Sequence, residues 1–449
     1  MKLKTALAII LVPCLIAAGG AAFWLPHPAG QANPDGKAPA TTQDQSALPQ
    51  TPTTPPSQPA GPQEPDTNQT AIPEPGDLGG LIKASNRFAL DMYSELANGQ
   101  DNLFFSPYSI FTALGMTYEG AVGKTAEELR SVFNYPADNE TRWALFKALI
   151  DTINMGDGKS NLSTANALWV QYGYPLYESF LNATTKYYDA NVSNVDTGGD
   201  PEGARAIING WVENRTNGKI KDLLPKGSID NARLILTNAI YFKANWLLAF
   251  NRTKTREMAF HTGPNSTVQA SMMVRNDEKS RYNYTKTDGL QLLEMLYAGE
   301  KYSMLVLLPG DNEMGTSETS LTLEKLREWK QNMTEQRVDV LFPKFRFDTV
   351  YQLNGNLSDM GMPSAFSPGG FSGIGPLASS LYISGIFHKA FVAVDEEGTE
   401  AAAATAVSFK DCVEPAVPSF NADHPFIFLI QERETGNILF MGKVLDPTK

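Results

Sequence analysis

The order of apolar and polar positions predicts helices first and strands later along residues 81–449. Apolar side chains recur with helical periodicity over residues 81–97 and 141–153. Because helices gather early and strands late, the pattern predicts an α+β fold rather than alternating βαβ units. Short, almost continuous apolar runs, typical of strands buried on both faces, follow at 234–243, 292–296, 302–308, 338–347, 390–394 and 425–430.

Residues 1–25 are predicted to form an export segment. Two lysines precede residues 5–25, which carry no charge and are long enough to span a bilayer as a helix. A membrane anchor and a cleaved signal peptide both fit this pattern, and the small residues at 17–22 offer cleavage sites. A lipid anchor on Cys14 fits less well, because a proline precedes that cysteine.

Residues 26–80 are predicted to form an extended linker. Thirteen of the 29 prolines lie there, mixed with Thr, Gln, Ser and Ala. Prolines stiffen a chain, and this composition leaves too little apolar surface to offset the entropy of ordering. We therefore expect a disordered spacer that holds the globular body, residues 81–449, away from a membrane or cell wall.

N-x-S/T sequons are more frequent than composition alone would give, and they favour an exported chain with a glycosylated surface. A surface that is merely rich in Asn, Ser and Thr is the alternative. The sequon asparagines are Asn68, Asn139, Asn161, Asn182, Asn191, Asn214, Asn251, Asn265, Asn283, Asn332 and Asn356.

Composition and charge exclude several classes of function. The chain has 449 residues, of which 42% are hydrophobic and 19% charged, so it can bury a sizeable core. Its net charge of -12 leaves no basic surplus for a nucleic-acid partner. Two cysteines and four scattered histidines without an H-E-x-x-H pair disfavour a disulfide scaffold and a zinc site. Metal chemistry and catalytic-triad chemistry are therefore disfavoured.

Residues 396–415 combine an alanine-rich run with strand-like alternation. A short surface helix is one interpretation, because alanine favours helices. Read as a strand, the segment has one small-to-apolar face and one face that is polar at both ends. The first face consists of Thr399, Ala401, Ala403, Thr405, Val407 and Phe409. This pattern suits a loop that is exposed in one state and an inner strand in another, since bulky side chains would obstruct entry between paired strands.

The globular body resembles the serpin family, from about residue 81 to the C-terminus. Each matching motif is moderately specific, and all of them occur in the family's order. The motifs lie at 102–110 (NLFFSPYSI), 216–220 (TNGKI), 234–246 (LILTNAIYFKANW), 388–402 (HKAFVAVDEEGTEAA) and 420–430 (FNADHPFIFLI).

The resemblance implies a serpin fold of three β-sheets with eight or nine helices and an exposed reactive-centre loop. It also implies an irreversible suicide-substrate inhibitor of extracellular serine proteases, which is expected to be no enzyme itself and to need no metal or cofactor. In such an inhibitor the protease cleaves the loop and stays acyl-linked to it, and the cut loop then enters the main sheet as a new strand. The native form must be kinetically held, because insertion stabilises the protein further.

The resemblance assigns the hinge and the reactive bond residue by residue. Glu396 matches the hinge glutamate, Gly398 supplies backbone freedom, and Thr399 is the first residue expected to enter the sheet. Counting forward from Glu396 by the family spacing places the reactive bond at Cys412–Val413. Ala401, Ala403 and Thr405 complete the hinge.

The resemblance also assigns a buried cluster beneath the main sheet. Ser106, Ser109, Asn238 and His388 match the shutter, a hydrogen-bonded cluster that must open to admit the loop. A histidine whose hydrogen bonds are satisfied in the core is compatible with that role. Trp246 matches the breach, where insertion begins.

The nature of the reactive bond favours some targets. Cys412 is uncharged and of medium to small size, which suits the shallow pocket of an elastase-like or subtilisin-like serine protease. Cleavage after Phe409 or Lys410 would suit chymotrypsin-like or trypsin-like enzymes, but it shortens the inserted strand. A non-inhibitory serpin that acts as a binding or chaperone module, and an inhibitor of papain-like cysteine proteases, are the alternatives. We expect a monomer that is extracellular or at the cell surface, secreted or tethered to a membrane through residues 5–25.

Overall fold

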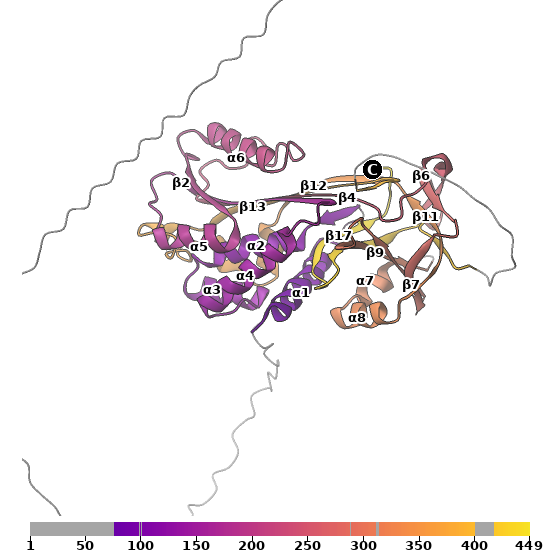
Figure 1. Ribbon diagram of the computed structural model, residues 1–449. Helices are drawn as coiled ribbons and strands as arrows, with labels where there is room; N and C mark the ends of the chain where they lie inside the picture. Colours follow the sequence, from indigo (N-terminus) through magenta and orange to yellow (C-terminus); the bar gives the residue numbers. More distant parts are fainter. Residues whose placement is uncertain (1–75, 98, 100, 288, 311–313, 400–416) are drawn as a thin grey trace, which may run out of the picture. The chain divides into compact units, whose positions relative to one another are not determined.

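The computed structural model describes residues 76–97, 99, 101–287, 289–310, 314–399 and 417–449 (Figure 1). Over these ranges the chain forms nine α-helices and three β-sheets, which confirms the fold that the resemblance implied. The helices are α1 (Leu78–Leu96), α2 (Pro107–Tyr118), α3 (Gly123–Phe133), α4 (Asn139–Asn154), α5 (Glu178–Tyr188), α6 (Pro201–Arg215), α7 (Met314–Ser320), α8 (Leu323–Gln331) and α9 (Asn354–Asp359).

The six-stranded sheet is called the main sheet below, and the other two are named by their strand number. In spatial order the main sheet contains β12 (Phe345–Gln352), β13 (Ile383–Val394), β14 (Gly398–Thr399), β4 (Leu234–Asn245), β2 (Ser160–Gln171) and β3 (Asn191–Val195). The seven-stranded sheet contains β1 (Leu103–Phe105), β17 (Ile438–Val444), β16 (Phe426–Glu432), β9 (Tyr302–Pro309), β8 (Leu290–Leu296), β7 (Arg281–Thr287) and β10 (Thr334–Arg337). The four-stranded sheet contains β15 (Ser419–Asn421), β11 (Asp339–Pro343), β6 (Ser266–Arg275) and β5 (Arg256–Gly263).

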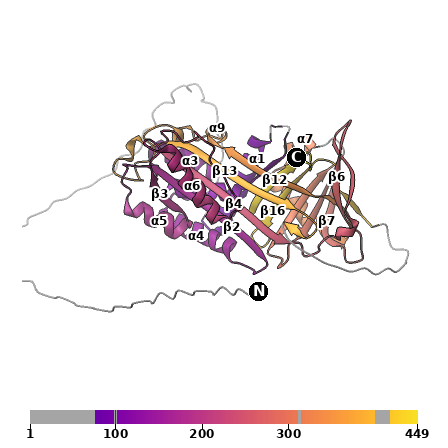
Figure 2. The same cartoon turned by 90° about the horizontal axis from the view of Figure 1, so that it is seen from above.

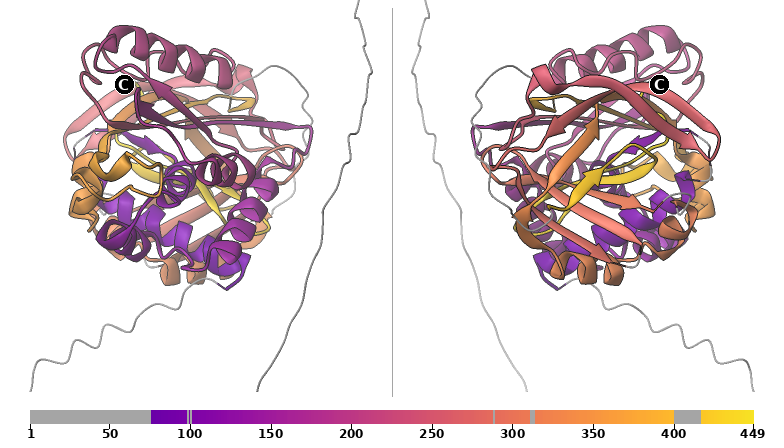
Figure 3. Two further views of the ribbon diagram at one scale, coloured as in Figure 1. Left: turned by 90° about the vertical axis from the view of Figure 1, so that its left-hand side faces the viewer. Right: turned by 90° about the vertical axis from the view of Figure 1, so that its right-hand side faces the viewer.

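Helices cover both faces of the main sheet. Helix α6 lies on one face, and α1 to α5 lie on the other (Figure 1). The end-on views show the same separation, with a single helix above the sheet and the violet helices of the first part of the chain beneath it (Figure 3). Strand β4 is buried on both faces because Ile235 packs with the core under α6, whereas Leu236 packs in the larger core on the opposite side.

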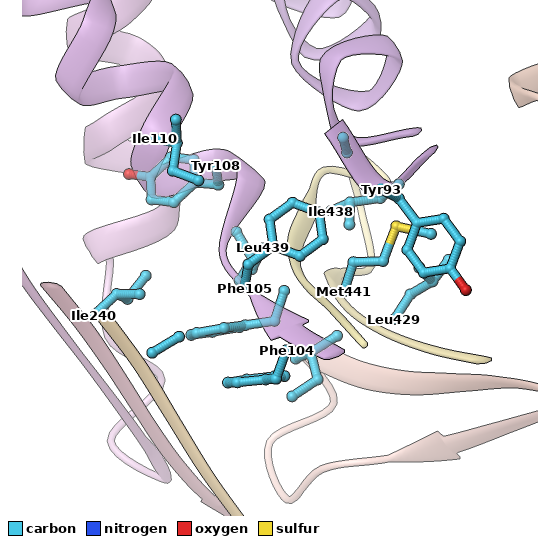
Figure 4. Close-up of a cluster of buried hydrophobic side chains, with 14 of the residues drawn as sticks. Tyr93, Phe104, Phe105, Tyr108, Ile110, Ile240, Leu429, Ile438, Leu439 and Met441 are labelled. Carbon is cyan, nitrogen blue, oxygen red and sulfur yellow. The ribbon is translucent and has the colours of Figure 1, made fainter. Parts of the chain in front are cut away.

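Helix α2 is a central helix whose residues from Pro107 to Thr117 are all buried. Ser106 caps it, since the side-chain oxygen accepts a hydrogen bond from the backbone N–H of Ser109, and Pro107 occupies the first turn, where its missing N–H costs nothing. The start of this helix packs with Phe105, Leu439 and Ile240, and so joins strands of the main and seven-stranded sheets (Figure 4). This packing holds α2 directly beneath the middle of the main sheet.

The apolar run predicted as one strand at 338–347 is two strands in two sheets. Strand β11 ends at Pro343 in the four-stranded sheet, and β12 begins at Phe345 in the main sheet. The backbone N–H of Lys344 donates to the carbonyl of Ser271 (2.9 Å), which holds the link between the two strands. The one-strand prediction was wrong because periodicity describes one strand at a time and does not identify its neighbours.

Candidate functional site

The predicted hinge begins inside the main sheet. Strand β14 lies between β13 and β4 and runs antiparallel to both. Thr399 pairs with Val394 of β13 on one side and with Ala244 of β4 on the other. Thr399 is only 1% exposed. The residue expected to insert first is therefore already buried between the two strands.

The Glu396 carboxylate fastens the turn between β13 and β14. One oxygen accepts a hydrogen bond from the Thr255 hydroxyl (2.7 Å), and the other accepts one from the Lys344 ammonium group (2.8 Å). The side chain of Glu396 is 6% exposed and that of Lys344 is 37% exposed. Burial by itself would raise the pKa of Glu396, but the hydrogen bonds from Lys344 and Thr255 outweigh it and lower this pKa below its usual value. The hinge glutamate is therefore ionised at neutral pH.

Glu397 ties the same turn to the segment that follows β4. Its carboxylate lies 2.5 Å from the guanidinium group of Arg252. Its backbone carbonyl accepts a hydrogen bond from the N–H of Trp246 (2.6 Å), and the carbonyl of Glu396 accepts one from the N–H of Phe250 (2.7 Å). The acidic run at the end of β13 is thus held by both side-chain and backbone contacts.

Gly398 occupies a position that only glycine fits. Its φ angle is 153°, a backbone conformation that other L-residues rarely adopt. A Cβ atom there would lie 2.2 Å from the carbonyl oxygen of Ala244 and 2.5 Å from Cα of Asn245. The glycine therefore allows the chain to pass against β4 as it enters the sheet.

Trp246, Tyr297 and Thr399 form one buried group at this end of the main sheet. The rings of Trp246 and Tyr297 are stacked, with centroids 4.5 Å apart, and the Trp246 indole N–H donates to the carbonyl of Asp395 (3.0 Å). The hydroxyls of Tyr297 and Thr399 lie 3.0 Å apart. Burial raises the pKa of Tyr297, so its hydroxyl keeps its proton. This arrangement places Trp246, the predicted breach residue, beside the predicted hinge.

The four predicted shutter residues meet beneath the middle of the main sheet. The backbone N–H of Ser106 donates to His388 Nε2 (3.0 Å), while His388 Nδ1 contacts Asn238 Oδ1. The side-chain amide of Asn238 donates to the carbonyl of Ser109 (2.9 Å), and the Ser106 hydroxyl donates to the carbonyl of Leu439 (2.6 Å). Helix α2 is thereby connected to β4, β13 and β17.

The hydrogen bonds determine the protonation of His388. Nε2 accepts a hydrogen bond, so the ring proton is on Nδ1 and is donated to Asn238 Oδ1. Burial lowers the pKa of His388 to about 3, because the charged ring would lose its hydration. His388 is 0% exposed and neutral, and these two partners satisfy both of its ring nitrogens.

The sequence interpretation missed Asn166 of β2 and Thr112 of α2, which belong to the same hydrogen-bonded cluster as the predicted shutter residues. Asn166 Oδ1 accepts a hydrogen bond from the Asn238 side chain, and Asn166 Nδ2 donates to the Thr112 hydroxyl (3.3 Å). The ring of Tyr351 also stacks on that of His388, with centroids 6.3 Å apart. Asn166 had a usable sequence signal, since it is a polar residue within an otherwise small-to-apolar stretch of strand.

Lys344, Arg252 and Tyr297 were also missed, although each touches the hinge. They come from three separate segments, and nothing in their local sequence distinguishes them from surface cations or core aromatics. Only the packing of these segments against β14 assigns them to the site.

Several predicted residues lie outside the described ranges. These are the hinge residues Ala401, Ala403 and Thr405, the reactive bond Cys412–Val413, and the export segment 1–25. In the part of the chain that the structure describes, none of the helices combines the length and apolar character that a membrane crossing needs.

Comparison with known proteins identifies the family to which the chain belongs. The family model described as serpin (serine protease inhibitor) matches residues 83–447. An uncharacterized serpin-like protein from Thermococcus kodakarensis is 44% identical, over 85% of this chain and 89% of its own length. The human leukocyte elastase inhibitor is 38% identical, over 82% of this chain and 99% of its own length.

Solved structures agree with these sequence relationships. The crystal structure of human thyroxine-binding globulin has a TM-score of 0.76 and 30% sequence identity, and the match covers 83% of this chain and 100% of that one. The family match spans nearly all of the globular body, including the residues predicted as hinge and shutter. The chain therefore belongs to the serpin family.

Proposed function

We propose that this serpin is an irreversible suicide-substrate inhibitor of extracellular serine proteases that cleave it at Cys412–Val413. An elastase-like or subtilisin-like target is favoured by the size of Cys412. The observation that carries the proposal is the position of β14, which is antiparallel to both β4 and β13 and lies between them. A strand that continued from β14 in the same direction would part these two strands where they now pair and would lie between them.

The register of β14 supports insertion by small residues. Gly398 pairs with Asn245 and Thr399 with Ala244. Because the two strands are antiparallel, each following residue of the loop would pair with the preceding residue of β4. Continued in this register, Ala401 would lie opposite Phe242 and Ala403 opposite Ile240. Both alanines would then face the larger core, on the same side as Thr399. Small side chains suit this position because bulky ones would have to displace a packed core.

The same register connects the hinge to the shutter. Thr405 would lie opposite Asn238 and beside His388. In the structure, Asn238 of β4 and His388 of β13 contact each other directly, because their strands are paired. That parallel pairing extends from Leu234 to Tyr241 on β4. Insertion therefore requires these strands to part and the contact between His388 and Asn238 to be replaced. Because these contacts must break first, the proposed insertion of the loop is slow, and it becomes possible once the loop is cleaved.

The covalent step is an acyl transfer. The hydroxyl oxygen of the protease serine adds to the carbonyl carbon of Cys412, and the bond from that carbon to the nitrogen of Val413 breaks. The proton of the serine hydroxyl passes to the amine of Val413, so an ester to Cys412 remains. Insertion of residues 400–410 before water hydrolyses this ester would make the inhibition irreversible.

The free energy released by loop insertion is so large that the uninserted form must be held by a kinetic barrier. Each new ladder hydrogen bond contributes about 1 kcal/mol net, and each buried apolar side chain contributes about 1.5–3 kcal/mol. Because a whole strand is gained, the sum is larger than the stability of an ordinary domain. The uninserted form is then a kinetically trapped state.

An electrophoresis experiment tests the proposed function. The protein is incubated with elastase-like and subtilisin-like proteases, and an SDS-stable complex of the summed masses is expected. The same proteases with the active-site serine blocked beforehand are the control and should give no complex. Rapid cleavage without a complex for every protease tried would reject inhibition and favour a binding or chaperone role. A complex that forms only with a papain-like enzyme would instead assign a cysteine-protease target.

The export segment and the linker lead us to propose that the inhibitor acts outside the cell. The support is the uncharged stretch at 5–25, the proline-rich linker that follows it, and the frequent sequons. Mass spectrometry of the mature N-terminus and of the sequon peptides tests both retention of residues 1–25 and glycosylation. A protein recovered intact and unmodified from the soluble cytoplasmic fraction would overturn this placement.

A further inference from the structure

The asparagines of the predicted sequons lie in very different environments. Asn139, the first residue of α4, is exposed, whereas Asn283 of β7 is half-buried. N-linked glycosylation attaches a bulky saccharide to the side-chain amide nitrogen of asparagine. In the folded protein that nitrogen must therefore face solvent and be free of tight contacts. The structure meets these conditions at Asn139 and not at Asn283.

The side chain of Asn139 is held by its oxygen atom. Asn139 Oδ1 accepts a hydrogen bond from Arg142 Nη2 (2.7 Å). Arginine can only donate, so the atom that faces it is the oxygen, and the amide nitrogen lies on the other side of the group. Within the part of the chain that the structure describes, Asn139 Nδ2 donates to no other group. This nitrogen is consequently presented to solvent.

Arg142 is a fixed partner for Asn139, because its own contacts are buried. The residue is 2% exposed. Its Nε and Nη2 atoms donate to the two carboxylate oxygens of Glu119 (2.7 and 2.8 Å), and Nη1 donates to the carbonyl of Pro136 (2.9 Å). A planar guanidinium group with this many partners keeps one orientation. The Asn139 side chain is thus held in one conformation before any modification.

Asn283 has the opposite arrangement, with its nitrogen turned into the protein. Its Nδ2 donates to Glu294 Oε2 (2.7 Å) on the neighbouring strand β8. Glu294 Oε1 accepts a hydrogen bond from the Ser303 hydroxyl of β9 (2.7 Å), and the Glu294 side chain is only 12% exposed. A saccharide on Asn283 would have to displace this carboxylate and leave it short of a partner in a mostly buried place. Modification of Asn283 is therefore incompatible with this fold.

Asn139 is also remote from the strand that follows residues 400–416 in the chain. Helices α4 and α5 lie together at one end of the globular body, and β6 lies at the other (Figure 2). Strand β15, which follows residues 400–416, is in the four-stranded sheet with β6. A saccharide on α4 would add hydrophilic bulk without covering that sheet.

We propose that Asn139 carries an N-linked saccharide in the mature protein and that Asn283 stays unmodified. This inference rests on the export part of the proposed function, since sequons are used in chains that leave the cytoplasm. The donor is a saccharide linked through phosphate to a polyprenol lipid. A bond forms between the anomeric carbon of the saccharide and Asn139 Nδ2, and the bond from that carbon to the phosphate oxygen breaks. The amide nitrogen loses one proton, which the medium takes up as the lipid phosphate departs.

Peptide mapping of the wild-type protein by mass spectrometry tests this inference. The protein is recovered from its own organism in separate exported and cytoplasmic fractions and is then digested. The exported protein should show a saccharide mass on most peptides that contain Asn139 and none on peptides that contain Asn283. An exported protein with a bare Asn139, or with a modified Asn283, would overturn the inference and leave export standing. Protein found only in the cytoplasm and unmodified would instead reject export, and the inference with it.

Two sequon variants assign the saccharide mass to its residue. Thr141→Ala removes the sequon but keeps Asn139 and its bond to Arg142, so the exported protein should lose the whole saccharide mass at residue 139. Thr285→Ala, which removes the sequon of Asn283, is the matched control and should change the protein mass by the substitution alone. A saccharide that persists at residue 139 in Thr141→Ala, or a saccharide mass lost in Thr285→Ala, would overturn the assignment.

Discussion

The hydroxyl of Thr399 lies 3.0 Å from the hydroxyl of Tyr297, on the buried side of the main sheet. Thr399 is the first hinge residue expected to insert, and Tyr297 stacks on Trp246, the predicted breach residue. The contact therefore marks the starting point of the proposed insertion. It also makes the hinge sensitive to any change in size or charge at this point.

Replacing Thr399 by arginine should convert the inhibitor into a substrate. The site is 1% exposed and bordered by Val394 and Ala244, so a guanidinium group cannot enter without an uncompensated burial of charge. We expect cleavage of the loop at the wild-type rate with no SDS-stable complex. Thr399→Ser, which keeps the hydroxyl that reaches Tyr297, is the matched control and should still trap the protease. Trapping by Thr399→Arg would contradict the proposed insertion face.

Removing the charge of Glu396 should loosen the hinge. Glu396→Gln breaks the ion pair with Lys344 at a mostly buried carboxylate, and we expect a loss of about 1–3 kcal/mol, measured as a lower urea midpoint. Glu335→Gln is the control, because Glu335 and its partner Arg281 are both exposed and the change should have no measurable effect.

A charge swap separates the ion pair from other effects at the same site. The combined change of Glu396→Lys and Lys344→Glu should recover part of the stability that Glu396→Lys alone removes. No recovery in the swapped protein would mean that Thr255 and the backbone, rather than the ion pair, hold this turn.

Substituting alanine for Gly398 should expel the start of the hinge from the sheet. The new Cβ would meet the carbonyl oxygen of Ala244 at 2.2 Å, and the φ angle of 153° is strained for alanine. We expect a cost of about 1–3 kcal/mol, seen as a lower thermal midpoint, and faster attack on the loop by a non-target protease. Gly210→Ala in α6, where the added carbon meets nothing within 4 Å, is the control and should not destabilise the protein. If the two variants have equal thermal midpoints and equal rates of attack on the loop, β14 is not held in the sheet in solution.

The native protein should lose stability as the pH falls from about 6.5 towards 3. The pKa of His388 is 6.5 in the unfolded reference and about 3 in the fold, so over this range the unfolded chain binds a proton that the native ring does not. The contribution of neutral His388 to the free energy of unfolding is complete above pH 6.5. Below that pH it falls by about 1.4 kcal/mol per pH unit. Thermal midpoints at a fixed scan rate across this range should fall less steeply for His388→Gln. The lowered pKa of Glu396 adds a loss of the same sign at the acid end.

The clipped molecule should resist heat and denaturant better than the intact one. A single cut near residue 412 frees residues 400–410 to complete the strand that β14 begins. Thermal unfolding of protein nicked at low protease concentration should show a clearly higher midpoint than that of intact protein. A protein carrying Thr399→Arg and nicked in the same way should show no increase, because its loop cannot enter. An unchanged midpoint for the nicked wild type would refute the insertion mechanism.

The sequence by itself determined much of this protein. Local periodicity was enough to predict the α+β class and most strands, because burial on one or both faces leaves a pattern within a few residues. The hinge glycine at 398 and the small residues after it could be predicted for the same reason, since backbone freedom and side-chain size are local properties. Family motifs then identified Ser106, Ser109, Asn238 and His388 as one group, and the structure brings them together.

Only the tertiary structure decided which segments meet at the hinge. Lys344, Arg252 and Tyr297 contact residues 396–399 from three distant parts of the chain, and no local pattern encodes such pairing. The division of 338–347 between two sheets had the same origin, because strand neighbours are chosen by packing across the whole molecule. The position of β14 between β4 and β13 is likewise a property of the assembled sheet, and the proposed mechanism depends on it.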